Sequence, residues 1–138
     1  MFRKRQIILS ATALCLLLAV VWGFYQYSRP HASVQDKQTA FIITADSLYG
    51  AFSTNEPAAN KTFMNKVLEV KGTVQDLTTS DRKPVLLLQT QGIGFVNCLM
   101  AVDSTTIFST IKKNSTVIIK GKCSGFLMDV NIVDCVIK

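Results

Sequence analysis

The feature that most constrains this chain is an uncharged, apolar run close to its N-terminus. Eighteen consecutive residues, Ile7 to Phe24, carry no charged side chain. At a rise of about 1.5 Å per residue a helix of this length extends about 27 Å, close to the hydrocarbon thickness of a bilayer. The run therefore predicts a transmembrane helix over residues 7–25. The rest of the 138-residue chain suffices for a single domain.

The charges on either side of this run predict its orientation. Arg3, Lys4 and Arg5 precede it and Arg29 follows it, so these four residues account for most of the formal net charge of +6. The excess before the run predicts a cytoplasmic N-terminus at residues 1–6 and a domain on the periplasmic or extracellular side. From residue 30 onward, eleven Lys or Arg residues face nine Asp or Glu residues, so the domain lacks the strongly basic character typical of nucleic-acid-binding proteins.

Two other interpretations of the N-terminal segment compete with a retained anchor. A secretory signal cleaved after Ala32 would place Pro30 where a small residue is preferred, and the apolar run is long for a signal. A lipoprotein signal would end at Cys15, but Leu14 stands where a small residue is expected. Retention is the preferred interpretation, and cleavage stays open.

Residues 26–40 separate the apolar run from the domain. Their sequence is polar and has no apolar period, which predicts an unfolded linker. His31, the only histidine of the chain, falls in this linker. We therefore expect it to be a solvated residue and neither a metal ligand nor a general base.

The domain over residues 41–138 begins with helical patterns and then changes to a strand period. Thr44 is a candidate N-cap for a helix of about ten residues ending near Asn55, and Pro57 suits the first turn of a second short helix. Beyond these, alternating polar and apolar residues predict five strands, with a turn over residues 78–84 and a helix over residues 103–113. The expected strands cover residues 66–77, 85–90, 95–101, 116–123 and 129–137.

The order of three strands, one helix and two strands is typical of the OB-fold, a five-stranded Greek-key barrel with a helix between its third and fourth strands. Gly72, within the first strand, suits the bend that a small barrel requires. We therefore expect a mainly β domain of this class, preceded by short helices.

The chain resembles the tRNA_anti-like family over about residues 40–138. The resemblance lies in the segments KVLEVKGTV, VNCLMA and VIIKGKCSGFLMDVNIVDCVIK. It implies an OB-fold related to the anticodon-binding domain of some tRNA synthetases. An activity inferred from this resemblance rests on fold analogy alone.

OB-folds bind ligands on the face of their second and third strands and in two flanking loops. Those regions predict four candidate ligand-binding residues, namely Arg82, Lys83, Phe95 and Phe126. OB-folds that bind single strands combine a basic groove with aromatic platforms, and this chain offers few of either. Lys71, Lys120 and Lys122 alternate along strands and are expected to be solvated.

Three cysteines belong to the domain, and an exported domain can keep a disulfide. Cys98 and Cys135 fall on the third and fifth strands, which are neighbours in an OB barrel, so they form the easier pair. Cys123 with Cys135 would not be opposed in a tight hairpin. The alternative is that all three are buried small hydrophobic residues without a bond. No zinc site and no paired redox motif is expected from this spacing.

No catalytic constellation, metal site or cofactor site is expected. Asp129 and Asp134 lie five residues apart on one strand, which predicts opposite faces. The sequence therefore predicts a non-enzymatic, membrane-anchored, exported OB-fold binding module for a protein, peptide or small ligand. The alternative is a nucleic-acid-binding OB-fold domain of the tRNA_anti-like type.

Overall fold

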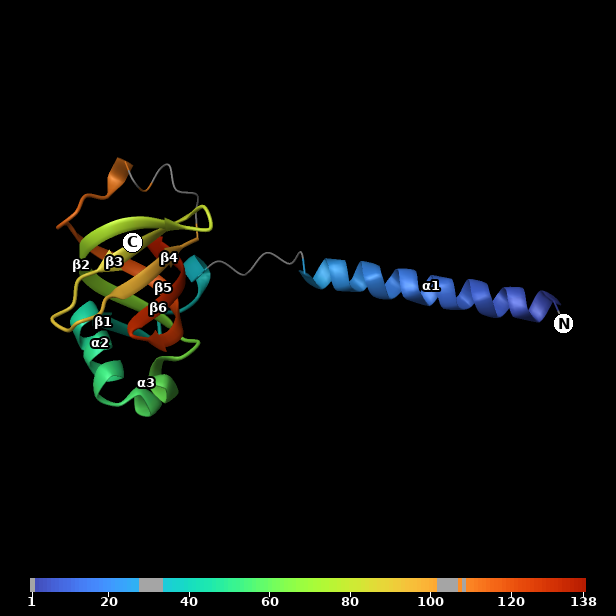
Figure 1. Cartoon of the computed structure of the whole chain (residues 1–138), viewed down its shortest axis with the longest axis horizontal. Coiled ribbons are helices and arrows are strands. Elements are labelled where there is room, and N and C mark those ends of the chain that lie inside the picture. Colours follow the sequence, from blue (N-terminus) through green and yellow to red (C-terminus); the bar gives the residue numbers. More distant parts are fainter. Residues whose placement is uncertain (1, 28–33, 102–106, 108) are drawn as a thin grey trace. The chain divides into compact units, whose positions relative to one another are not determined.

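The computed structural model of this chain describes residues 2–27, 34–101, 107 and 109–138. The chain divides into two compact units, Met1–Ala32 and Ser33–Lys138, and both are drawn in Figure 1. His31 lies outside the described residues. The first unit contains one helix, and the second contains the sheet.

The helix of the first unit, α1, runs from Phe2 to Tyr27, and so includes the apolar run. Crossing a bilayer takes about 20 mostly apolar residues in one helix. Within the described residues, no helix has the length and apolar character needed for a membrane crossing. The expected transmembrane span over residues 7–25 is therefore not confirmed.

The second unit is mainly β, and its described residues form six strands, the helices α2 and α3, and one short 3-10 helix, η1, with further helical residues at 107 and 109–110. The first part of this unit holds η1 (Val34–Asp36), β1 (Phe41–Thr44), α2 (Ala45–Thr54) and α3 (Glu56–Phe63). The remaining strands are β2 (Val67–Ser80), β3 (Lys83–Leu88), β4 (Val96–Met100), β5 (Thr116–Leu127) and β6 (Asp129–Ile137). The five predicted strands are present, and β1 is a sixth that the sequence pattern did not predict.

The strands form one mixed sheet in the order β1-β2-β3-β4-β6-β5, with an additional pairing of β2 with β5. With that pairing β3, β4, β5 and β6 each have two neighbours, and β2 has three, namely β1, β3 and β5. The long strand β2 makes this possible, because residues 67–73 pair with β5 while residues 74–80 pair with β3. Both β1 with β2 and β4 with β6 run parallel, and the other pairs are antiparallel.

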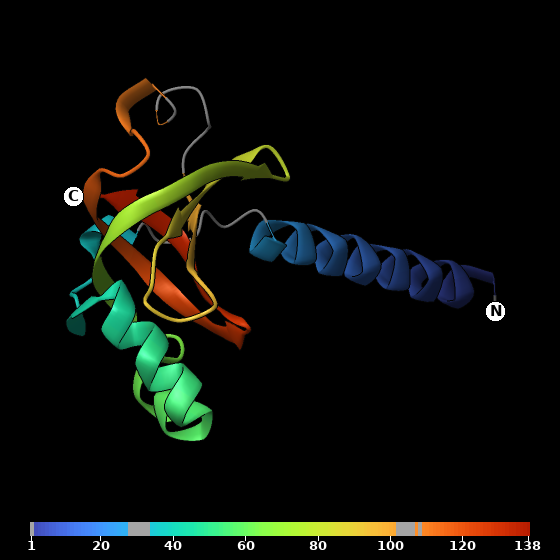
Figure 2. The same ribbon diagram turned by 60° about the vertical axis from the view of Figure 1, so that its left-hand side comes forward.

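The predicted helices are confirmed in α2 and α3. Thr44 caps α2, since its hydroxyl accepts a hydrogen bond from the Ser47 amide at 3.2 Å, and Asn55 caps α3 in the same way through Ala58. These caps satisfy amides that a helix leaves without intrahelical partners. Figures 1 and 2 show α2 and α3 together at one end of the sheet.

The core fills the space between the sheet and these helices. Its fully buried side chains come from α2 and from every strand between β2 and β6, and the largest are Leu48, Phe52, Leu68, Leu86, Leu88, Met100, Ile119 and Ile132. The helix expected over residues 103–113 falls partly outside the described residues. Of those described, Ile107 and Ile111 are joined by a helical hydrogen bond of 3.0 Å and are buried.

The end of the expected linker is folded against the sheet, contrary to the prediction. Val34, in η1, is 3% exposed, and the Lys120 ammonium donates to the Gln35 carbonyl at 3.0 Å. The Thr39 hydroxyl donates to the Glu69 carboxylate at 2.7 Å. These polar residues are ordered although they show no apolar period, because Glu69 on β2 and Lys120 on β5 supply hydrogen-bond partners.

Glu69 itself is nearly buried on β2. It receives the hydrogen bond from Thr39 and two from the Lys138 ammonium at 2.9 and 3.0 Å. These bonds favour the ionised carboxylate and hold the pKa of Glu69 below its ordinary value. The segment before β1, strand β2 and the last residue of the chain are thereby joined at one point.

Candidate binding groove

A groove of about 480 Å³ lies on the outer surface of the sheet across β2, β3, β4 and β6; we call it the sheet groove. Its lining residues are Thr78, Ser80, Val85, Leu87, Asn97, Leu99, Asp129, Asn131, Ile132 and Val133. Side chains alternate between the two faces of a strand, so every second residue of β3 and β4 faces the core and the others face the sheet groove. The intervening ones, among them Val85, Leu87 and Leu99, are half-buried.

Strand register sorts the lining residues into rows that run across the sheet. Leu87 pairs with Asn97, and Asn97 pairs with Asn131, so two amides lie side by side next to a leucine. One step along, Val85 pairs with Leu99. The sheet groove therefore combines an apolar row, formed by Val85 and Leu99, with a polar row, formed by Asn97 and Asn131. This arrangement is typical of sites that bind apolar groups and orient them through a few polar atoms.

Asp129 holds the polar row together. Its Oδ1 accepts a hydrogen bond from the Phe95 amide at 2.7 Å, and its Oδ2 accepts one from Asn97 Nδ2 at 3.2 Å. Asn97 Nδ2 also donates to Asn131 Oδ1 at 3.4 Å. With the amide nitrogen turned to these acceptors, Asn97 Oδ1 is buried and accepts no hydrogen bond from any residue that the structure describes.

A smaller hollow of about 280 Å³ adjoins the sheet groove, and we call it the helix recess. It is lined by Glu56, Asn60, Met64, Ser124, Gly125, Phe126, Leu127 and Asn131. Asn131 therefore lines both hollows. Asn60 Oδ1 is a second buried oxygen without a hydrogen-bond partner in the described structure.

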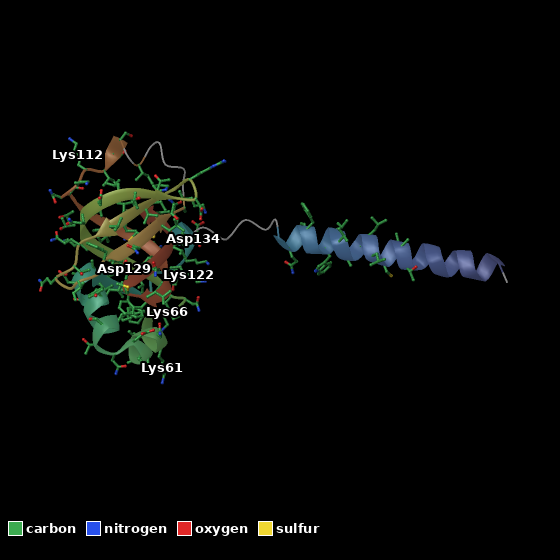
Figure 3. All side chains as sticks on the ribbon, viewed as in Figure 1. Lys61, Lys66, Lys112, Lys122, Asp129 and Asp134 are labelled. Atoms are coloured by element: carbon green, nitrogen blue, oxygen red, sulfur yellow. The ribbon has the colours of Figure 1, made fainter. Side chains whose placement is uncertain are left out.

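The charges lining the two hollows are acidic. Asp129 and Glu56 are the charged residues among the lining residues of the sheet groove and the helix recess, and neither set contains Lys or Arg. Lys61, Lys66 and Lys122, labelled together with Asp129 in Figure 3, belong to α3, the segment before β2, and β5. The site thus offers acceptors and negative charge where an OB-fold that binds nucleic acid offers cations.

The structure separates the four ligand-binding residues that the sequence predicted. Arg82 and Lys83 are exposed at the β2–β3 turn, where Asp81 and Arg82 both have a positive φ. This tight two-residue turn replaces the loop expected over residues 78–84, and the strands continue up to it. Lys83 shares the face of Val85 and Leu87 by the strand period.

Of the two predicted aromatics, Phe126 packs against other rings, and Phe95 takes part through its backbone. Phe126 stacks on Phe52 with ring centroids 5.6 Å apart and meets Tyr49 edge-on at 5.9 Å, so only part of it lines the helix recess. Phe95 is half-buried, and its amide is one of the donors that fix Asp129. The Phe126 ring is therefore packed against Tyr49 and Phe52 of α2 and is not a free stacking platform.

Sequence reasoning missed the polar row. Asp129 was considered only in relation to Asp134, and neither asparagine was singled out. The available signals were one polar residue in the apolar strand VNCLM and the alternation of Asp129 and Asn131. Neither signal shows which strands are neighbours, so the row could be assembled only in the tertiary structure.

A third hollow of about 490 Å³ lies beside the N-terminus of α2, with Asp46, Lys71 and several threonines in its lining. Asp46 accepts a hydrogen bond from the Gln91 amide at 2.7 Å. None of the described residues lining this hollow contributes a buried polar atom without a partner. The linings of the sheet groove and the helix recess each include a residue with such an atom, Asn97 and Asn60. We therefore take these two hollows as the better candidate site.

Cys98, Cys123 and Cys135 are buried free thiols. Cys98 and Cys123 flank Ile132 on its two sides, about two strand spacings apart and too far to bond. A register shift between Cys98 and Met100, which pair with Ile132 and Cys135, turns Cys135 inward. Burial and the neighbouring Cys98 thiol then raise the pKa of Cys135 well above its ordinary value.

The bridge expected between Cys98 and Cys135 stays a prediction. The two residues are diagonal neighbours across β4 and β6, and strand spacing places their Cα atoms about 8 Å apart. A disulfide usually spans about 4.4–6.8 Å, so closure requires the strands to shift. Counting alkylated thiols in exported, unreduced protein decides the matter, since a bridge leaves one free thiol in the domain and its absence leaves three.

Among the described residues, no group of three His, Cys, Asp or Glu side chains forms a metal site.

The family of the chain follows from comparison with known proteins. The tRNA_anti-like family model matches residues 1–137. The chain belongs to the tRNA_anti-like family. No curated protein is similar enough to the chain to count as a match.

Among solved structures, the fold is similar to that of a lipoprotein from Klebsiella pneumoniae subsp. pneumoniae, whose name proposes that it binds nucleic acid. The TM-score is 0.56 at 10% identity, covering 80% of this chain and 99% of the other. The telomere capping protein Ten1 from Saccharomyces pombe has a TM-score of 0.43 at 18% identity, covering 73% of this chain and 80% of Ten1. The similarity to the Klebsiella lipoprotein shows the fold of this chain. The TM-score with Ten1 is too low to support an inference.

Proposed function

We propose that this tRNA_anti-like protein is a non-enzymatic binding module, and that its five strands β2 to β6 form an OB-type barrel whose sheet groove holds an extended peptide segment of a protein partner. One observation carries the proposal. The sheet groove sets half-buried Val85, Leu87 and Leu99 beside the polar row fixed by Asp129. A volume of about 480 Å³ lies within the range of ordinary ligand sites.

An extended peptide suits this groove because it presents apolar side chains and backbone amides at regular spacing. The apolar row accepts side chains, and the oxygens of Asp129 and Asn131 accept hydrogen bonds. Burying one apolar side chain of Val or Leu size contributes about 1.5–3 kcal/mol before the ordering cost of the peptide. Two such side chains and a few hydrogen bonds therefore support a weak, reversible interaction.

We also propose that the domain is exported and held at a membrane by its N-terminal segment. The uncharged run Ile7–Phe24 lies within α1, and the Klebsiella protein of similar fold is a lipoprotein. Cell fractionation with alkaline extraction tests the association, and protease treatment of cells whose outer envelope has been removed or permeabilised, with the inner membrane sealed, tests the side on which the domain lies. Protein that is extracted with the peripheral fraction, or that protease cannot reach, would contradict this part of the proposal.

The alternative function is binding of single-stranded nucleic acid. The family name and the Klebsiella structure favour it, while the acidic lining of the sheet groove opposes it. Phosphate contacts make such binding fall steeply with salt concentration.

The test compares the two functions in the full chain, kept in mild detergent. Binding of a random-sequence peptide library and of a labelled oligothymidylate is measured at low and high salt, with Leu87→Glu and Ile118→Glu variants. We expect peptide binding that Leu87→Glu abolishes and that Ile118→Glu, on the opposite outer wall, leaves intact. Salt-sensitive oligonucleotide binding without peptide binding would replace the proposal by its alternative.

A further inference from the structure

The domain exposes large apolar residues on two loops that touch each other. Among the described residues of the second unit, the most exposed large hydrophobic ones are Ile93 at 97%, Leu127 at 84% and Met128 at 82%. Ile93 lies in the loop before β4, and Leu127 and Met128 form the β5–β6 turn. The loops are in contact, because a Cβ on Gly94 would lie 2.5 Å from the Met128 backbone oxygen. We call Ile93, Leu127 and Met128 the apolar tip.

Hydrogen bonds hold the apolar tip in its exposed position. The Phe95 amide donates to Asp129 Oδ1 at 2.7 Å, and the Val130 amide donates to the Phe95 carbonyl at 3.0 Å. These two bonds tie the loop before β4 to the strand that follows the turn. The Gly94 amide donates to the Tyr49 hydroxyl at 3.1 Å, which ties the same loop to α2. The exposure of the apolar tip is therefore a built feature of the fold.

Met128 is an unusual residue for its backbone conformation. Its φ of 68° lies in the left-handed region, which glycine, asparagine and aspartate adopt more readily than a long apolar side chain. Those residues would form the turn with less strain and would expose no apolar surface. The turn instead keeps Leu127 and Met128 at a conformational cost. Contiguous exposed apolar surface of this kind marks a contact with a protein or a membrane.

The surroundings of the apolar tip favour lipid acyl chains as its occupant. The segment QTQGIGF before β4 carries no charged residue, and Asp129 is the one charged residue in SGFLMD. Its carboxylate already accepts hydrogen bonds from the chain. Ile93 and Met128 line none of the three hollows described above, so they project from the surface. Projecting apolar side chains need a matching pocket on a protein, whereas a fluid acyl-chain layer takes them without one.

The length of the chain before the domain allows a contact with lipid. Residues 28–33 join α1 to η1, and a segment of that length spans at most about 25 Å. The chain then enters the sheet beside Lys120, which bonds the Gln35 carbonyl. Leu127 lies seven residues further along β5, about 23 Å away at 3.3 Å per residue. A bilayer that holds α1 is therefore within reach of the apolar tip.

We propose that the apolar tip enters the acyl-chain region at the surface of the bilayer that holds α1, and so gives the folded domain a membrane contact of its own. This inference rests on the proposed membrane attachment and adds a second contact to it. Burial of apolar surface drives the contact. It therefore requires no lipid charge, and salt does not weaken it as it weakens contacts between exposed charges.

Tryptophan fluorescence tests the contact, because the one tryptophan of the chain, Trp22, lies in α1. The full chain is reconstituted in uncharged phosphatidylcholine vesicles, with or without acyl-chain bromine, which quenches tryptophan on contact. Unchanged Trp22 reports on α1. In a Trp22→Phe background, Met128→Trp and Ile93→Trp report on the apolar tip. Lys112→Trp is the matched control, since Lys112 is exposed and Figure 3 shows it far from Asp129, which follows Met128.

We expect brominated lipid to remove most of the emission of Met128→Trp and Ile93→Trp, at low and at high salt, and to leave Lys112→Trp unchanged. Two tip positions keep the test decisive if one variant fails to fold. Quenching of Trp22 without quenching of the tip variants, or equal quenching of Lys112→Trp, would overturn the inference and leave the membrane attachment standing. Unquenched Trp22 would remove both.

A second copy of the chain is the other occupant that the same experiment detects. Its signature is a blue-shifted emission from the tip variants that brominated lipid does not quench and that grows with the density of protein in the vesicles. That result would assign the apolar tip to an interface between copies and would also overturn the inference.

Discussion

Gly94 is the position where a single methyl group should disturb both the stability of the domain and its groove. A Cβ added there would lie 2.5 Å from the backbone oxygen of Met128 and 2.7 Å from Asp129 Oδ1 and from the Tyr49 ring. The Gly94 amide also donates to the Tyr49 hydroxyl at 3.1 Å. The loop before β4 must therefore move away from the β5–β6 turn in Gly94→Ala.

Overpacking of this kind costs about 1–3 kcal/mol of unfolding free energy. We expect the upper half of that range, because a backbone oxygen yields less than the end of a flexible side chain. With an m-value of roughly 2 kcal/mol per molar urea, the unfolding midpoint should fall by about 1 M. The movement also separates the Phe95 amide from Asp129, so peptide affinity should fall with stability.

The three buried thiols of the domain supply the assay. Cys98, Cys123 and Cys135 are shielded in the folded domain, so their alkylation in increasing urea, measured on reduced full chain by mass spectrometry, follows unfolding of the sheet. Gly50→Ala is the control, because a Cβ there meets nothing within 4 Å and should stabilise α2 by about 0.5–1 kcal/mol. A Gly94→Ala midpoint equal to or above the wild-type value would refute the reasoning.

Two further predictions concern the caps and charges that hold the domain. Glu69 has a lowered pKa in the folded state, so its stabilising contribution is complete at neutral pH and is lost as the pH falls below about 4.5 through the folded pKa. The difference in unfolding midpoint between wild type and Glu69→Gln should therefore shrink from pH 7 to pH 3, and a constant difference would contradict this. Thr44→Ala should cost about 1 kcal/mol by removing the α2 cap, measured by urea denaturation; Thr62→Ala, an exposed helical threonine, is the control and should cost less.

Local chemistry predicted much of the fold from the sequence. Thr44 and Asn55 precede amides that require acceptors, so the two caps and their helices could be placed without tertiary information. The strand over residues 129–137 was predicted with its observed bounds. Alternation of side chains is a property of each strand by itself, and it survives in whatever sheet the strand joins.

The differences from prediction arise where a segment depends on distant partners. Strand β1 has only four residues, too few to show a period, and it exists because β2 offers a parallel edge. Strand β5 extends to Leu127 and closes on β6 through Met128, whose φ is positive, so residues 124–127, which lie between two of the expected strands, are themselves strand. The Cys135 thiol faces the core because of a register shift that no single-strand pattern shows.

The order of residues alone thus determined the apolar N-terminal segment, the two capped helices and the alternating strands, because each depends on interactions within a few residues of chain. Only the tertiary structure decided which strands are neighbours and in which register. Asn97 and Asn131 are separated by 34 residues and meet because parallel pairing of β4 and β6 sets them opposite each other. Register is fixed by packing summed over the whole sheet, so the site that depends on it belongs to the fold and not to any one segment.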